Sequence, residues 1–194
     1  MPQSTKLMKL YFRPYLRYKF FNALFTGMVG GSVFTIYASL PPSTFSVGGI
    51  VLALGMMALA YVYHRLMTVE YFFRFTLASE LIMLIMVGYF LLFASNLTTA
   101  LIVYVAYQFS FVFGGYLVRA ETHFARHSRV MGWIDIAKQQ GSLTGLALSY
   151  GFYKILEHFG ITQSSVQVYD LHFGLLGLEI LIIICLIYSF RKNK

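Results

Sequence analysis

The residues best suited to chemistry are two glutamates within long apolar stretches, Glu80 and Glu179. An ionisable side chain in hydrocarbon costs several kcal/mol unless it faces a partner, a protein interior or water. Each carboxyl group could therefore be retained because it carries a proton, which makes both residues candidates for proton coupling. The alternative is that each glutamate stays neutral and hydrogen-bonds a neighbouring helix.

Two other apolar stretches each carry a stripe of polar and aromatic side chains at helical spacing. Two interpretations are possible. The stripes line an aqueous cavity that binds a solute, or they form hydrogen bonds between helices and only hold the bundle together. If the stripes line a cavity, the predicted substrate-binding residues are Asn22, Thr26 and Tyr37 on the first stripe, and Tyr104, Tyr107, Gln108 and Arg119 on the second.

Two further stretches are rich in small residues, which let helix backbones approach closely. Gly48, Gly49 and Gly55 lie in one of them, and Gly141-Ser-Leu-Thr-Gly145 forms a small-xxx-small motif in the other. These glycines are predicted to line helix-packing or dimer interfaces.

Asp135 and Lys138 are spaced i, i+3 and lie beside Trp133, a residue type that favours the membrane interface. The spacing predicts a local ion pair within one helix. The sharper alternative is a latch that opens and closes a gate.

Signatures of metal binding and catalysis are weak. His123 and His127 are spaced i, i+4 with Glu121 close by, but neighbouring arginines would repel a cation, so no metal site is predicted. The sequence has no Gly-x-Ser-x-Gly elbow, His-Glu-x-x-His motif, P-loop or Asp-rich metal run. Neither an enzyme activity nor a cofactor is predicted.

The elements that must position these residues are helices in a membrane. Apolar residues make up 58% of the chain and charged residues only 11%, whereas soluble domains have about 25% charged residues. A helical span needs roughly 20 apolar residues. We therefore predict an all-α polytopic membrane protein with six transmembrane helices, the first of them kept as a span rather than a cleaved signal. The predicted spans are 19–40, 46–63, 73–94, 98–118, 131–156 and 171–190.

The cations predict the orientation of these spans. The net charge of +8 comes from lysines and arginines between the apolar blocks, so it indicates topology rather than nucleic-acid binding. Of the lysines and arginines, 14 fall on the side shared by both chain ends and only Lys154 on the other. Both termini are thus expected in the cytoplasm, with residues 1–18 as a basic amphipathic leader and 191–194 as a basic tail. The expected location is a cell membrane, specifically a bacterial inner membrane.

The stretch from Arg129 to Gly151, RVMGWIDIAKQQGSLTGLALSYG, resembles the junction between the fourth and fifth spans of major facilitator superfamily transporters. The six-span spacing is similar to one half of that twelve-span fold. The family's Gly-x-x-x-Asp-Arg-x-Gly loop should fall near 61–74, where its glycine and aspartate are absent. The resemblance implies that spans one and four line a cavity, that two and five join the halves, and that three and six, with Glu80 and Glu179, lie outside it.

A chain that resembles one half of this fold needs a second unit to form the other wall of the cavity. The lopsided cations argue against insertion in both directions, so the expected assembly is a parallel homodimer. The predicted function is a secondary transporter that moves a small solute by alternating access through a cavity lined by spans one and four. The alternative is a non-transporting membrane subunit or scaffold that docks a partner protein.

Overall fold

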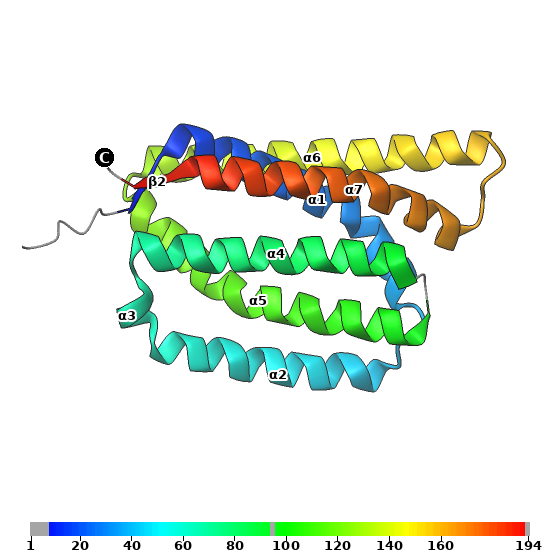
Figure 1. Cartoon of the computed structure of the whole chain (residues 1–194), viewed down its shortest axis with the longest axis horizontal. Helices are drawn as coiled ribbons and strands as arrows, with labels where there is room; N and C mark the ends of the chain where they lie inside the picture. Colours follow the sequence, from blue (N-terminus) through cyan, green and yellow to red (C-terminus); the bar gives the residue numbers. More distant parts are fainter. Residues whose placement is uncertain (1–7, 94–95, 193–194) are drawn as a thin grey trace, which may run out of the picture.

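The computed structural model describes residues 8–93 and 96–192, and this part of the chain is almost entirely helical (Figure 1). Two short strands lie next to the chain ends, β1 (Met8–Leu10) and β2 (Phe190–Lys192). The helices are α1 (Phe12–Tyr37), α2 (Pro42–Tyr61), α3 (Tyr63–Leu66), α4 (Val69–Phe93), α5 (Leu97–Ala125), α6 (Ser128–His158) and α7 (Ser164–Ser189).

The six long helices coincide with the six predicted spans, but several boundaries differ. α1 begins at Phe12, so residues 12–18 of the predicted leader form its first two turns, and residues 1–7 of the leader lie outside the described residues. Pro14 does not break this helix because it lies in the first turn, where the backbone N–H groups have no intrahelical acceptor. α5 continues to Ala125 and α7 begins at Ser164, since a helix can extend past the apolar residues that define a span.

Five of the long helices, α1, α2, α4, α5 and α7, are long and apolar enough to cross a membrane. α6 is not among them, although it has 31 residues. Polar residues such as Asp135, Lys138 and Gln140 interrupt its first half. The described chain therefore has the character of a multi-pass membrane protein, and the span predicted over 131–156 stays a prediction.

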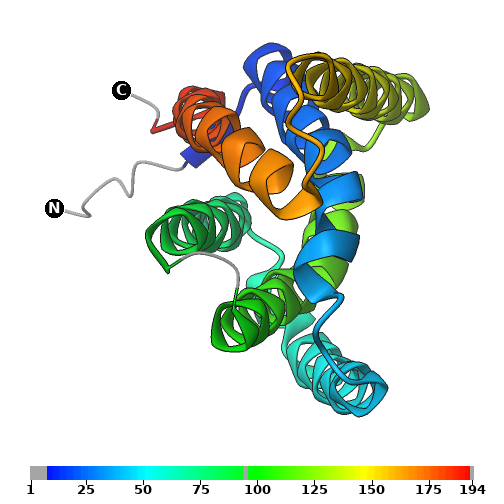
Figure 2. The same ribbon diagram turned by 90° about the vertical axis from the view of Figure 1, so that its right-hand side faces the viewer.

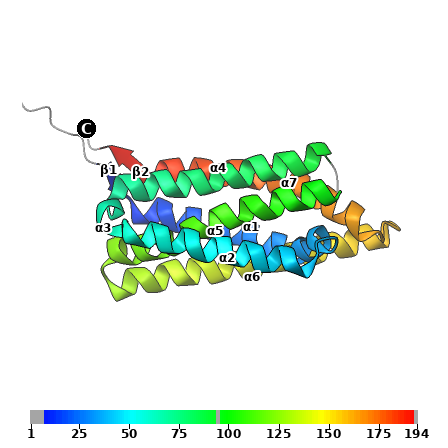
Figure 3. The ribbon, with the colours of Figure 1, turned by 90° about the horizontal axis from the view of Figure 1, so that it is seen from below.

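The long helices lie side by side along one direction (Figures 1 and 3). α1 packs against α6 and α7, α5 packs against α2 and α4, and α4 packs against α7. These neighbours map onto one another when α1, α2 and α4 are exchanged for α5, α6 and α7. Because α1 and α5 run in opposite directions, the two triplets are related as an inverted repeat. Seen end-on, α2 and α6 form the two ends of an arc (Figure 2).

Both ends of the described chain lie at one end of the bundle. β1 pairs with β2 in antiparallel register, which places Lys9 opposite Arg191. α3, which carries Arg65, and the turn between α5 and α6, which carries Arg126, lie at the same end (Figure 1), and Arg129 follows in the first turn of α6. We call this the basic end of the bundle.

The glycines of α6 allow it to lie directly on α1. A Cβ atom at Gly141 would overlap the backbone carbonyl of Phe20, and one at Gly145 would overlap the carbonyl of Leu24. Both glycines are buried within the chain, so the packing interface they line is internal.

The glycines of α2 are used differently. Gly48 lies against the ring of Tyr104 and Gly55 against Val112, so both accept side chains of α5. Gly49 has no neighbour within 4 Å of its Cβ position. Within the described chain, Gly48 and Gly55 serve helix packing, and the role of these glycines in a dimer stays a prediction.

Candidate functional site

Glu80 of α4 is buried where α4 meets α1. Its side chain is 3% exposed and accepts hydrogen bonds from the hydroxyl of Tyr18 at 2.5 Å and from the amide of Asn22 at 3.0 Å. Both donors come from consecutive turns of α1, so one helix face supplies the polar environment that a buried carboxyl group requires.

Glu179 of α7 completes a pair of carboxyl groups. It is fully buried and interacts with the carboxyl group of Glu80, but neither of its oxygens has a hydrogen-bond partner of regular geometry among the described residues. Two ionised carboxylates facing each other away from water repel strongly, and a proton held between them removes that repulsion. The pair is therefore suited to bind and release a proton.

A buried ion pair lies about one turn nearer the basic end along α1. Lys19 of α1 is 2.9 Å from Glu121 of α5, and the hydroxyl of Tyr15 donates a hydrogen bond of 2.6 Å to the same carboxylate. The Lys19 ammonium also lies about 6 Å from the rings of Tyr15 and Tyr18, close enough for cation–π attraction. This ion pair joins α1 to α5 beside the carboxyl pair.

Sequence reasoning missed the role of Glu121 because it placed residues 119–130 in a loop. The signal was present: Tyr107, Gly114 and Glu121 are spaced by seven residues, which keeps them on one face of a continuous helix. α5 is continuous through this region, and Glu121 faces α1 rather than His123 and His127.

Between the ion pair and the opposite end of the bundle, α1, α4 and α5 enclose a cavity of about 280 Å³. We call it the central cavity. Its volume is near the lower end of small-molecule sites, which span about 300–1,000 Å³. Because α4 forms its floor through Glu80 and Met83, the cavity opens on the opposite face, where Thr26 and Phe111 are exposed. Its polar lining comes from Asn22, Thr26, Ser79, Glu80, Tyr107 and Ser110.

An aromatic cluster lies at the end of the cavity away from the basic end. The ring of Tyr37 packs edge-on against Tyr104 and Tyr107, with ring centroids 5.5 and 6.4 Å apart, and Phe45 of α2 joins them. α1 and α5 therefore touch at two levels, through Lys19 and Glu121 and through these aromatic rings. The central cavity lies between the two contacts.

The structure divides the predicted substrate-binding residues. Asn22, Thr26 and Tyr107 line the central cavity, and Tyr37 lies at its aromatic end. Tyr104 and Gln108 instead face α2, where they line a second groove. Arg119 is exposed at the basic end and lines neither.

The division follows from helix geometry, because successive residues are rotated by about 100° and one helix cannot turn two adjacent stripes toward the same cavity. Tyr107 faces α1 and α4, whereas Tyr104 and Gln108 face α2. The position of Glu80 also differs from the one that the family resemblance implied, which was outside the cavity. α4 is packed between α5 and α7, and its Glu80 side chain points inward to α1 and lines the cavity.

Two other predicted features are local. Lys138 and Asp135 lie 3.8 Å apart on the surface of α6, so they form the predicted ion pair within one helix, and the gate latch stays a prediction. In the part of the chain that is described, no three His, Cys, Asp or Glu side chains converge as a metal site. His123 and His127 are exposed, whereas Glu121 is turned toward α1.

The fold and the site together define a class: a helical protein with several helices apolar enough to cross a membrane, a buried carboxyl pair and a small cavity beside it. The chain matches no protein-family model, no curated protein and no solved structure.

Proposed function

We propose that this protein is a secondary transporter of a small solute, with six membrane spans and both termini in the cytoplasm. The observation that carries the proposal is the central cavity, where hydrogen-bonding groups from three helices meet a buried carboxyl group. Polar groups at this depth are costly in lipid, and a solute pathway is the commonest reason to keep them.

The cavity is suited to alternating access because it is closed by different contacts at its two ends. The ion pair of Lys19 and Glu121 lies toward the basic end, and the cluster of Tyr37, Tyr104 and Tyr107 lies toward the other. Each contact joins α1 to α5. A small rotation of one helix relative to the other would break one contact while keeping the other, and transporters of this kind rock rigid units around a fixed site.

Glu80 and Glu179 are the proposed site of proton coupling. Glu80 lines the cavity and contacts Glu179, so a solute that displaces Asn22 from Glu80 would change how strongly the pair holds its proton. The inverted repeat of the helices supports this mechanism, because transporters place solute and ion sites at the interface between such repeats.

A parallel homodimer would supply the second wall. The cavity opens on the face bounded by α2 and α6, the ends of the arc in Figure 2. A second copy with the same orientation could enclose that face, as the two fused halves do in the family that the sequence resembles.

The test of the cavity uses cysteine labelling and needs no knowledge of the solute. In a Cys185→Ser background, Thr26→Cys places a thiol in the cavity and Ile85→Cys places one on the 66%-exposed outer face of α4. A membrane-impermeant maleimide reacts with a hydrated thiolate, so Thr26→Cys should react in intact membranes and Ile85→Cys should not. Equal protection of both thiols would contradict an aqueous cavity.

The test of transport follows proton movement in proteoliposomes that contain a pH-sensitive dye. When a panel of small polar solutes is added outside, at least one should drive proton flux, and Asn22→Ala should reduce that flux more than Gln108→Ala. This order is expected because Asn22 lines the central cavity and Gln108 faces the second groove.

The alternative function, a subunit that docks a partner protein, is favoured by one observation. The groove between α2 and α5 has a volume of about 690 Å³ and is lined by Gln108, whose amide oxygen is buried without a hydrogen-bond partner among the described residues. A donor on a partner helix would satisfy that oxygen. Stable co-purification of one protein that Gln108→Leu abolishes, together with absence of solute flux, would favour this alternative.

A further inference from the structure

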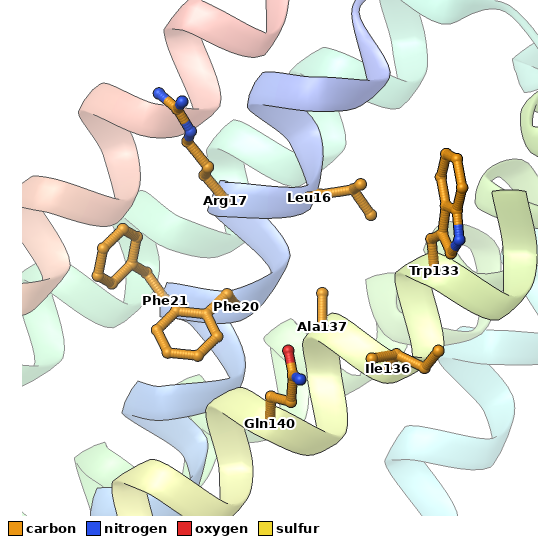
Figure 4. Close-up of a pocket in the computed structure, with 8 residues that line it drawn as sticks. All are labelled: Leu16, Arg17, Phe20, Phe21, Trp133, Ile136, Ala137 and Gln140. Carbon is orange, nitrogen blue, oxygen red and sulfur yellow. The ribbon is translucent and has the colours of Figure 1, made fainter.

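A third hollow lies on the outside of the bundle, away from the central cavity and from the groove between α2 and α5. It is a groove of about 570 Å³ between the first halves of α1 and α6 (Figure 4). Its apolar wall is formed by Leu16 and Phe20 of α1 and by Trp133 and Ile136 of α6, and its polar groups are Arg17 and Gln140. We call it the outer groove.

The depth of the groove matches the boundary between lipid headgroups and acyl chains. Arg17 lies five residues after the start of α1 at the basic end, which is about 7–8 Å along the helix axis. Trp133 is 54% exposed at the corresponding level of α6, and tryptophan concentrates at this boundary because its ring is apolar and its N–H is polar.

The rim of the groove on the side of α7 carries positive charge, because the Arg17 side chain runs from α1 toward α7 (Figure 4). Arg13 and Arg17 are exposed and lie one helical turn apart on α1, and neither forms a salt bridge with any described residue. The acids nearby already have partners, because Glu121 pairs with Lys19 and Asp135 with Lys138. A guanidinium group at this depth is complementary to a phosphodiester.

We propose that the outer groove binds an anionic glycerophospholipid in the leaflet at the basic end. Arg17 and Arg13 hold the phosphate and the acidic headgroup, and the amide of Gln140 is placed to donate to the glycerol or ester oxygens. One acyl chain lies along Phe20 and Ile136. Basic pockets between transmembrane helices recognise headgroups in this way.

The experiment is a lipid titration followed by native mass spectrometry of the detergent-solubilised full chain. Dioleoyl phosphatidylglycerol and dioleoyl phosphatidylcholine have the same acyl chains, so the ratio of their affinities isolates the headgroup. The native chain should prefer phosphatidylglycerol about fivefold, which corresponds to about 1 kcal/mol, the contribution of one cation near a membrane surface.

Arg17→Gln should remove that preference, whereas the control Arg65→Gln should keep it. Both changes remove one exposed cation from the basic end, but Arg65 lies in α3, on the far side of the bundle from the groove. Ala137→Trp should weaken binding of both lipids, because Ala137 lines the groove and a tryptophan there would fill it. Retained helical circular dichroism would show that the variants fold.

Three outcomes would overturn the proposal. The native chain could bind both lipids equally, Arg17→Gln could keep the preference, or soluble glycerophosphate could compete as well as the lipid. If a second copy of the chain occupied the outer groove, the spectra would show a dimer without bound lipid. That result would also contradict the proposal.

Discussion

At the residue scale, three carboxyl groups and one ammonium group form a connected cluster. Lys19 pairs with Glu121 and lies near Glu80, which faces Glu179, and Tyr15 and Tyr18 donate to Glu121 and Glu80. One cation cannot neutralise three carboxylates in a medium of low dielectric constant. We propose that the carboxyl pair of Glu80 and Glu179 shares a proton, and that a helix movement that admits water releases it.

Glu80→Gln is expected to abolish solute-driven proton flux while the protein stays folded. The amide keeps the size of the carboxyl group and can still accept from Tyr18, but it cannot exchange a proton. Flux in proteoliposomes checks this, with Glu70→Gln as the control, because Glu70 lies on the same helix and forms only an exposed pair with Arg74. Undiminished flux in Glu80→Gln would exclude this residue as the coupling site.

Lys19→Met is expected to destabilise the protein by about 3 kcal/mol, because it leaves the buried carboxylate of Glu121 without its cation. The double variant Lys19→Met, Glu121→Gln should recover much of the loss, since no charge is then left unpaired. Thermal unfolding followed by circular dichroism in detergent measures both. Additive losses would mean that the two side chains do not interact.

At the element scale, α6 owes its position to small residues. Its glycines let the backbone of α6 touch the backbone of α1 along two turns, and Ser142 extends the contact by donating to the carbonyl of Ala23 at 3.5 Å. Close approach of the two backbones gains dispersion energy, to which the Ser142 hydrogen bond adds. It also places α1, which supplies Asn22 and Thr26 to the cavity, at the centre of the bundle.

Gly145→Ala is expected to destabilise the protein by roughly 1–3 kcal/mol, because the added methyl group would push α6 away from Leu24. Gly151→Ala is the matched control on the same helix, where the added Cβ meets no atom within 4 Å. That change should be neutral or slightly stabilising, since alanine favours the helix more than glycine does. Apparent Tm values in one detergent compare the two, and equal values would refute the close helix contact.

At the scale of the whole molecule, the paired strands bring both ends of the described chain together at the basic end. All the described connections at that end carry arginine, and the positive-inside rule predicts that they lie in the cytoplasm. The proposed dimer requires the same orientation in both copies.

Thiols placed in the turn between α5 and α6 should therefore be protected from an impermeant maleimide in intact cells and labelled after the cells are opened. His127→Cys, in a Cys185→Ser background, serves this purpose because residue 127 is exposed. Ser164→Cys, at the exposed start of α7, lies at the opposite end of the bundle and should label in intact cells. The reverse pattern would invert the proposed topology.

The particle mass in nanodiscs should correspond to two chains of 22.1 kDa. Close approach of the two cavity faces predicts that Phe34→Cys, 80% exposed on α1, forms a disulfide between copies more readily than the Ile85→Cys control on α4. A protein that is monomeric at every lipid-to-protein ratio would contradict the homodimer.

Composition and periodicity by themselves determined the helices and their order. Apolar stretches of about 20 residues separated by prolines, charges and polar turns leave no other regular structure in lipid, so every long helix was predictable to within several residues. The polar stripes of Asn22 and Thr26 were equally visible, because a period of 3.6 residues places them on one face whatever the helix packs against.

Only the tertiary structure decided which polar faces meet. The pairing of Lys19 with Glu121, of Tyr18 with Glu80, and of Glu80 with Glu179 joins residues that lie between 62 and 102 positions apart, and the spacing within one helix carries no information about the rotation of another. The same holds for Gln108 and Arg119, which share a helix with Tyr107 but face away from the central cavity. Helix rotation and neighbour choice depend on how small and large side chains interlock along the whole bundle, which is a property of the assembled fold.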